Sequence, residues 1–308
     1  MAIELASPPT LDDLDLSLGK RTRLYHLLYK YGPANGTLLL MPIDQGLEHG
    51  PRDFFANPAS ADPEFQLRLA RDGGYSGIVM HVGLARKFMH KYAGQVPLIL
   101  KLNGKTDIPP DHQAFSPQTA SVAEAARLGA DAVGYTLYVG SPAQDRDFTQ
   151  LAAIREECER LGLPLIVWSY PRGEAVDIKG GRDSIYAIAY AARVAAELGA
   201  DIIKVNLPQL DNPNAASQPK PYNDLHLSLE EAVNHIIASA GRVMTIISGG
   251  AKVSDDELLE KARVSMAAGA TGLIFGRNLW QRPWNEAIAM TNRIKDVLYQ
   301  FGRPSPLG

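Results

Sequence analysis

The sequence contains a single cysteine, Cys158, so the chain cannot form an internal disulfide bond. A lone cysteine suits a reducing cytosol. No apolar run is long enough to cross a membrane, which would take about 18 or more residues. The N-terminal segment lacks both a basic region and a long apolar core, so it does not predict a signal peptide. We therefore expect a cytoplasmic protein with no membrane partner.

Clustered positive charge and metal-binding motifs are also missing. The chain has 31 Lys and Arg against 34 Asp and Glu, a formal net charge of −3, and no basic run. This balance does not favour nucleic acid as a partner. The seven histidines show no tight ligand spacing, and neither HExxH nor CxxC occurs. The sequence therefore predicts no metal site, although two histidines brought together by the fold remain an alternative.

What the sequence does contain is an alternation of short aliphatic runs with amphipathic helical patterns. Such an alternation predicts parallel βα units. The expected helices include 119–128, 150–161, 184–198, 229–240 and 255–268. The expected strands number eight, at 38–43, 77–82, 98–102, 132–138, 165–169, 201–205, 243–247 and 272–275.

A faint internal repeat supports the same organisation. Gly129, Gly199 and Gly269 lie at equal intervals, and each ends a helical pattern and opens a strand. Eight strands without a break in composition predict a single-domain α/β fold, the (β/α)8 TIM barrel. An open doubly wound sheet is the alternative, but the glycine fingerprint of a dinucleotide site is missing after the first strand.

We divide the chain into two parts on this basis. Residues 1–37 form a short N-terminal extension, in which a helix at 23–31 closes the bottom of the barrel and the rest is a loose arm. Residues 38–308 form the barrel and carry the catalytic site.

The most informative residue is Lys204, in the middle of the apolar run 199–208. Burying an unpaired ammonium is costly, so such a lysine either finds a counter-charge or loses its proton. A neutral lysine is a nucleophile that forms a Schiff base with a carbonyl substrate. The alternative is a lysine at a strand end whose stem reaches water.

Two glycine loops at the ends of the last strands predict a phosphate site. Ser248-Gly249-Gly250 lets backbone amides approach an anion without an intervening Cβ. Gly276-Arg277 adds a guanidinium at an expected helix start. Phosphate sites after strands 7 and 8 recur in this fold. The alternative is two ordinary glycine turns and a surface arginine.

Other polar residues at strand ends complete the predicted site. Trp168 and Tyr170 share one face of their strand, and on the lumen side the phenol would point toward Lys204 and transfer protons. An aromatic pair that only fills the barrel is the alternative. Asp44 can steer a substrate hydroxyl, pair with a lysine or form an Asx turn. Lys101 either lowers the proton affinity of Lys204 or neutralises Asp44, and we count it among the substrate-binding residues.

The connection 208–226 is rich in Pro, Asn, Gln and Ser and follows the strand that bears Lys204. Long loops in compact domains are often lids or binding loops, so we expect such a role here. A mobile insertion without a function is the alternative.

Six motifs follow one another between about residues 38 and 280, at 42–50, 101–106, 168–173, 201–204, 248–250 and 276–277. Together they resemble the archaeal-type class I fructose-1,6-bisphosphate aldolases, which group with the deoxyribose-phosphate aldolase-like barrels. One departure is visible, because the family often has Asp-His-Gly where this chain has Asp44-Gln45-Gly46.

The resemblance implies a reversible cleavage of fructose 1,6-bisphosphate without metal or cofactor. By resemblance, Lys204 forms the Schiff base, Tyr170 transfers protons with Trp168 beside it, and Asp44 is the aspartate at the end of strand 1. The loops carrying Ser248, Gly249, Gly276 and Arg277 bind the C1 phosphate, and Arg172 lies near the other phosphate. The family also implies a homo-oligomer, such as a decamer.

Three alternatives remain for the activity. Relatives with the same lysine act on other phosphorylated ketoses, as in the autoinducer-2 phosphate thiolase and the amino-dideoxy-heptulosonate synthase. A non-catalytic sugar-phosphate sensor would bind without turnover, and it leaves the buried lysine unexplained. A metal-dependent aldolase would be sensitive to chelators.

Overall fold

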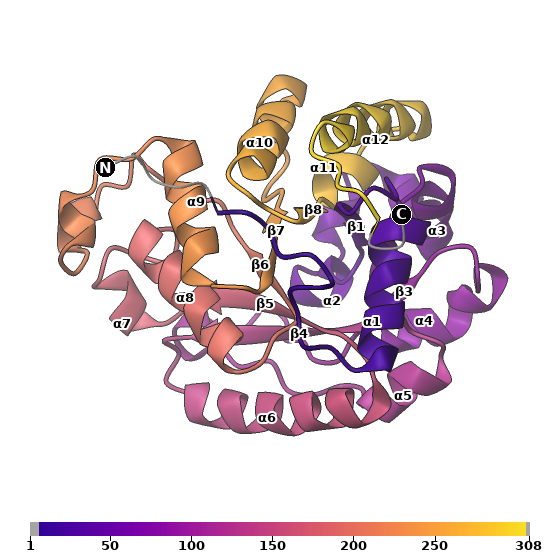
Figure 1. The fold of residues 1–308 in the computed structure, drawn as a ribbon, viewed down its shortest axis with the longest axis horizontal. Helices are drawn as coiled ribbons and strands as arrows, with labels where there is room; N and C mark the ends of the chain where they lie inside the picture. The colour runs from indigo at the N-terminus through magenta and orange to yellow at the C-terminus, as the bar shows by residue number, and fades with distance from the viewer. Residues whose placement is uncertain (1–5, 306–308) are drawn as a thin grey trace.

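The computed structural model describes residues 6–305. Within this range eight parallel strands close into one barrel in sequence order (Figure 1). Strand β1 pairs with both β2 and β8, so the predicted TIM barrel is confirmed and the open-sheet alternative is wrong. The strands are β1 Leu38–Pro42, β2 Gly77–His81, β3 Leu98–Lys101, β4 Ala132–Val139, β5 Leu165–Pro171, β6 Ile202–Val205, β7 Met244–Ser248 and β8 Gly272–Ile274.

Helices surround the barrel, with α6 along one edge in Figure 1 and α10 and α12 on the opposite side. In the described part of the chain, no helix is both long and apolar enough to span a membrane. The helices are α1 Leu18–Tyr25, α2 Gln45–Glu48, α3 Pro63–Asp72, α4 Val82–Phe88, α5 Val122–Arg127, α6 Gln144–Leu161, α7 Glu174–Asp177, α8 Ile185–Glu197, α9 Leu229–Ser239, α10 Asp255–Ala267, α11 Arg277–Trp280 and α12 Trp284–Tyr299.

The ends of these helices follow local sequence signals. Ser228 begins α9 with a capping box, in which its side chain and that of Glu231 each bond the other's backbone amide. Gly129, Gly199 and Gly269 have φ values of 72°, 91° and 100°, a region that side-chain-bearing residues rarely adopt. The glycine repeat therefore stops three helices just before β4, β6 and β8, as the sequence indicates.

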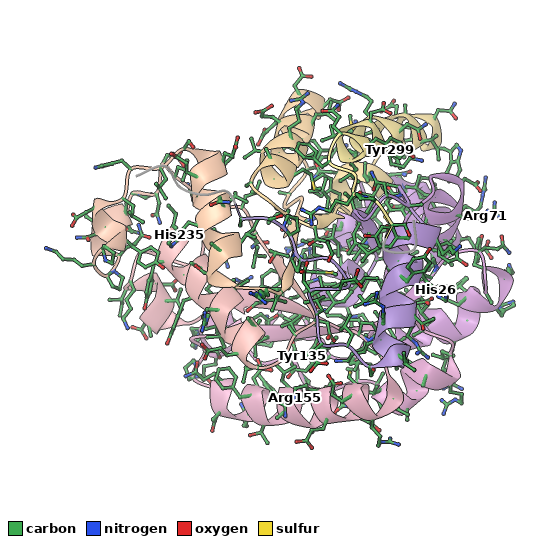
Figure 2. The ribbon with its side chains drawn as sticks, in the orientation of Figure 1. His26, Arg71, Tyr135, Arg155, His235 and Tyr299 are labelled. Carbon is green, nitrogen blue, oxygen red and sulfur yellow. The ribbon has the colours of Figure 1, made fainter. Side chains whose placement is uncertain are left out.

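Polar groups also fix helix α6 on the outer face of β4. Tyr135, labelled beside this helix in Figure 2, donates its hydroxyl hydrogen to the Asp147 carboxylate and accepts a hydrogen bond of 2.8 Å from Gln150. All three side chains are satisfied within the buried layer, so the contact sets the position of α6 without leaving a buried polar group unpaired.

The inside of the barrel has its own apolar core. Alternate residues of the strands point inward, among them Val79, Ile99, Ile166, Ile202 and Ile246. Leucines from the N-terminal segment join the same cluster from below, namely Leu11, Leu24, Leu27 and Leu28. Apolar side chains therefore fill the lower lumen.

The N-terminal segment lies across the amino ends of the strands. Its helix begins at Leu18 rather than at residue 23 and continues as a π-helix, His26–Lys30. Leu11 is only 1% exposed, so the expectation of a loose arm is wrong at this point. The Lys20 side chain, 2% exposed, forms ion pairs with Glu159 and, at 2.9 Å, with Asp201 just before β6.

We predict that Lys20→Ala lowers the free energy of unfolding by about 3 kcal/mol, because it leaves the mostly buried Asp201 without its cation. Urea denaturation followed by circular dichroism measures this change. Lys30→Ala, at an exposed lysine of the following π-helix, is the matched control and should change stability by less than about 0.5 kcal/mol. Equal effects of the two variants would contradict the buried ion pair.

Candidate active site

Lys204 lies on the lumen side of β6, near its carboxyl end. It has the same parity as Ile202, which belongs to the lumen core, and it pairs in register with Trp168 of β5. The Lys204 residue is 8% exposed. The side chain therefore does not escape along the outer wall, and its amine lies at the top of the solid lower lumen.

Two aromatic side chains of β5 surround the Lys204 amine. Nζ donates a hydrogen bond of 2.5 Å to the hydroxyl of Tyr170. The same nitrogen lies 5.4 Å from the centre of the Trp168 ring and 5.1 Å from that of Tyr170. The predicted placement of both rings on the lumen face is therefore confirmed, with the phenol directed at the lysine.

A second lysine, Lys101 of β3, is held by two carboxylates. Its Nζ is 3.2 Å from Asp44 and 2.6 Å from Glu48, and it lies 5.0 Å from the Trp168 ring. The side chain is 0% exposed. Lys101 therefore neutralises Asp44, and its charge also lowers the pKa of Lys204, so both predicted roles fit the structure. Its contact with substrate stays a prediction.

Sequence reasoning missed Glu48 as a site residue. Asp44 and Glu48 are four residues apart across the single turn of α2, a spacing that places two side chains on one face of a helix. That spacing was a usable signal, because two carboxylates beside strand-borne lysines form a buried charge network.

A glycine makes room for this network. A Cβ on Gly134 of β4 would lie 2.7 Å from the Trp168 ring and 3.1 Å from the Lys101 side chain. The distance to the indole is shorter than side-chain carbons tolerate and that to Lys101 is a tight contact, so the absence of a side chain at this position lets the indole and the lysine meet.

The environment changes the proton affinity of the central groups. Burial lowers the pKa of Lys204 to about 8, helped by the charges of Lys101 and Arg277 and opposed by Asp44 and Glu48. Burial, together with the charges of Glu48 and Asp44, raises the pKa of Tyr170, which stays a neutral phenol. The resting site thus pairs an amine that readily loses its proton with a hydroxyl that keeps one.

The predicted phosphate loop after β7 is shaped by asparagines. The Ser248 hydroxyl donates to the side-chain oxygen of Asn206 at 2.6 Å. The Asn278 amide donates to the carbonyls of Gly249 and Ala251, at 3.2 and 3.1 Å. Gly250 has a φ of 66°, which favours glycine. The sequence predicted the role of the glycines. It did not predict that Asn278 fixes this loop, because that contact joins the ends of two different strands.

The loop after β8 is equally constrained. A Cβ on Gly276 would lie 2.9 Å from both Gln45 and Pro42, so Gln45, where the resembled family often has histidine, packs against this loop. Arg277 begins α11, which has only four residues, so its guanidinium matters more than a helix dipole. Its Nη1 lies 3.8 Å from the Asp53 carboxylate.

These groups surround a cavity of about 550 Å³ above Lys204. Trp168 and Lys101 are not among its lining residues and lie in the wall behind it. No residue of the connection 208–226 lines it either, so the predicted lid does not cover the cavity in this structure. The predicted residues that do line it are Lys204, Tyr170, Asp44, Ser248, Gly249, Gly250, Gly276, Arg277 and Arg172.

The connection 208–226 instead packs against the outer helices. The Tyr222 ring lies 5.4 Å from Tyr186 of α8 and 5.4 Å from His235 of α9. Among residues 6–305, no group of three or more His, Cys, Asp and Glu side chains is arranged to hold a metal ion.

A closed (β/α)8 barrel with an amine at the base of a polar cavity has the architecture of a barrel enzyme. Over residues 38–282 the chain matches the DeoC/LacD family aldolase, and it belongs to that family. It is 40% identical, over 86% of its length and 90% of the relative's, to the class 1 fructose-bisphosphate aldolase of Thermoproteus tenax.

Two further comparisons bear on the chemistry. A solved archaeal fructose-1,6-bisphosphate aldolase, whose catalytic lysine is covalently bound to the carbinolamine intermediate, is 38% identical with a TM-score of 0.76, covering 90% of this chain and 99% of that one. A fructose-bisphosphate aldolase/6-deoxy-5-ketofructose 1-phosphate synthase of Methanocaldococcus jannaschii is 32% identical over 84% of this chain and 80% of its own length.

We predict that Lys204 reacts with an amine-specific reagent, such as trinitrobenzenesulfonate, with a pH midpoint near 8, because the amine is nucleophilic only after it loses its proton. Mass spectrometry of the peptide that contains Lys204 measures the rate at each pH. In Glu48→Gln the midpoint should fall, since the Glu48 charge raises this pKa. Glu174→Gln, at an exposed acid of α7, is the control. An upward shift in Glu48→Gln would contradict the charge network.

Proposed function

We propose that this chain is a class I fructose-1,6-bisphosphate aldolase that reversibly forms dihydroxyacetone phosphate and glyceraldehyde 3-phosphate. The observation that carries the proposal is the buried amine of Lys204, with its pKa lowered to about 8, at the base of a cavity lined by the two glycine loops. Membership of the DeoC/LacD aldolase family supports it.

The first half of the reaction makes the Schiff base. The neutral Nζ of Lys204 bonds to C2 of the open-chain sugar, and the former ketone oxygen leaves as water once it is protonated. Tyr170 is placed to donate that proton, because its hydroxyl lies 2.5 Å from Nζ and stays protonated at neutral pH. Asp44 orients a substrate hydroxyl beside the new iminium.

The second half breaks the C3–C4 bond. The proton of the C4 hydroxyl passes to the tyrosinate of Tyr170, the C3–C4 electron pair moves to the iminium nitrogen, and glyceraldehyde 3-phosphate leaves. The enamine then takes a proton at C3, and water hydrolyses the iminium to free dihydroxyacetone phosphate and Lys204. Because the iminium is the electron sink, this route requires no metal or cofactor.

The two phosphates supply binding energy away from the reacting bond. We assign the C1 phosphate to the two glycine loops and place Arg172 near the C6 phosphate. Trp168 orients the amine by packing beside it. The residues of the C1-phosphate loops are Ser248, Gly249, Gly250, Gly276 and Arg277.

The wider setting is also part of the proposal. We expect the enzyme to act in the cytoplasm on a phosphorylated sugar, in glycolysis or gluconeogenesis, without nucleic-acid or membrane partners. The family resemblance further suggests a homo-oligomer such as a decamer. Residues 1–37 would form the extension that closes the barrel bottom and 38–308 the catalytic domain, and the ends 1–5 and 306–308 lie outside the described residues.

We predict that borohydride, added together with fructose 1,6-bisphosphate, leaves a stable adduct on Lys204, because it reduces the iminium to an amine. Mass spectrometry of the digested protein locates the adduct. Lys204→Ala should lose both the adduct and the cleavage activity, while Lys179→Ala, at an exposed lysine of the same barrel end, keeps both. An adduct on another lysine, or inactivation by EDTA, would refute the Schiff-base scheme.

We predict that Tyr170→Phe lowers kcat at least about 100-fold with a small change in KM, because a positioned acid and base contributes about 10² to 10⁴ in rate. An assay that couples dihydroxyacetone phosphate to its reduction measures both constants. Turnover of another phosphorylated ketose but not of fructose 1,6-bisphosphate would instead favour one of the related aldolase or thiolase activities.

A further inference from the structure

Three cations converge on one carboxylate at the rim of the cavity. Lys105 Nζ lies 2.8 Å from Oδ1 of Asp111, while Arg172 Nε and Arg182 Nη1 lie 3.2 and 3.4 Å from its Oδ2. The four residues come from three segments: Lys105 and Asp111 from the β3–α5 connection, Arg172 from the end of β5, and Arg182 from between α7 and α8. All four line the same cavity as Lys204.

This cluster is joined to the proposed catalytic groups through Arg172. Its guanidinium lies 5.3 Å from the centre of the Tyr170 ring and 5.8 Å from that of Tyr138, and it donates 2.8 Å to the carbonyl of Pro171. These contacts hold Arg172 without help from Asp111. Arg172 is therefore built into the barrel rim, whereas the Arg182 side chain is 51% exposed.

The hydrogen-bonding capacity of the cluster is not filled by its carboxylate. Arg172 Nε is buried and has the ion-pair contact to Asp111, yet it makes no hydrogen bond of proper geometry in the structure. Burial opposes ionisation of Asp111, but Lys105 and the two arginines outweigh it and hold its pKa below the usual value. Asp111 thus brings one charge to three cations, and the only other carboxylate paired with them in the described residues is Asp183, 3.8 Å from Arg182. A phosphate offers two charges and three acceptor oxygens.

The backbone around Asp111 is attached at both ends but exposed between them. Asn103 donates 3.1 Å to the carbonyl of Ser116, and the Ser141 hydroxyl donates 2.6 Å to that of Ala114. Asp111 opens a short 3-10 turn, Asp111–Gln113, and every residue from 106 to 110 is exposed. Few buried contacts oppose an outward movement of this turn.

We propose that Asp111 is an internal substitute for the substrate's second phosphate. In the empty site its carboxylate occupies the Lys105–Arg172–Arg182 cluster, and a bisphosphorylated sugar displaces it to bind there. A sugar with only the C1 phosphate does not displace Asp111 and gains nothing from the cluster. Asp111 therefore sets how strongly the enzyme prefers a doubly phosphorylated substrate. This inference rests on the proposed aldolase function.

The test compares fructose 1,6-bisphosphate with fructose 1-phosphate in Asp111→Asn, which keeps the shape and removes the charge. The KM for the bisphosphate should fall about fivefold, the range of one or two partly exposed ion pairs, while kcat/KM for fructose 1-phosphate changes less than about twofold. Asp177→Asn is the control, since Asp177 is an exposed acid of α7 that does not line the cavity. It should leave the ratio of the two kcat/KM values unchanged.

Arg182→Gln should have the opposite effect to Asp111→Asn. It removes a cation of the cluster and should therefore reduce the preference for the bisphosphate. If Asp111 only positions the cations, Asp111→Asn will raise the bisphosphate KM or leave the ratio unchanged, and the inference is overturned. Borohydride trapping of Lys204 separates the two proposals. If the adduct forms but Asp111→Asn leaves the ratio of the two kcat/KM values unchanged, only the role of Asp111 is refuted. If neither sugar gives an adduct, the aldolase function is refuted.

Discussion

The site depends on the different charge environments of two lysines inside the upper lumen of the barrel. Two lysines, Lys101 and Lys204, lie within contact of the same Trp168 ring. The carboxylates of Asp44 and Glu48 both contact Lys101, so that lysine remains charged and fully buried. Lys204 has a phenol beside it instead, and burial then outweighs the more distant carboxylates. Lys101 is therefore a fixed charge, and Lys204 is the amine that we propose to react with substrate.

Other parts of the barrel maintain this difference between Lys101 and Lys204. The apolar lower lumen excludes water from below, which strengthens every electrostatic effect on the Lys204 amine. Gly134 leaves the space in which the indole and Lys101 meet. Asn278 ties the loop after β7 to the loop after β8, so the two glycine segments proposed to hold a phosphate move as one unit. Catalytic groups on rigid strands and binding groups on tied loops are a recurring solution in this fold.

Much of the site was predictable because strand ends carry chemistry in a barrel. The eight strands were located within one or two residues, since each is a short aliphatic run that ends at a polar residue or turn. Strand parity correctly placed Trp168 and Tyr170 on the lumen side with Lys204. Two predictions were less successful. The connection 208–226, expected to be a lid or binding loop, packs on the outer helices, and the N-terminal arm, expected to be loose, has a buried Leu11. Loop packing depends on distant side chains, which periodicity does not encode.

The sequence by itself determined the alternation of strands and helices, the barrel, the lysine in an apolar strand and the glycine loops, because all of these are local patterns. Only the tertiary structure decided which carboxylates Lys101 contacts, that Glu48 belongs to the network, and that Asp111 lies among three cations. Such pairings join segments far apart in the chain, and their geometry is set by closure of the barrel. The pKa of Lys204 depends on those distances and on burial, so it too is a property of the folded molecule.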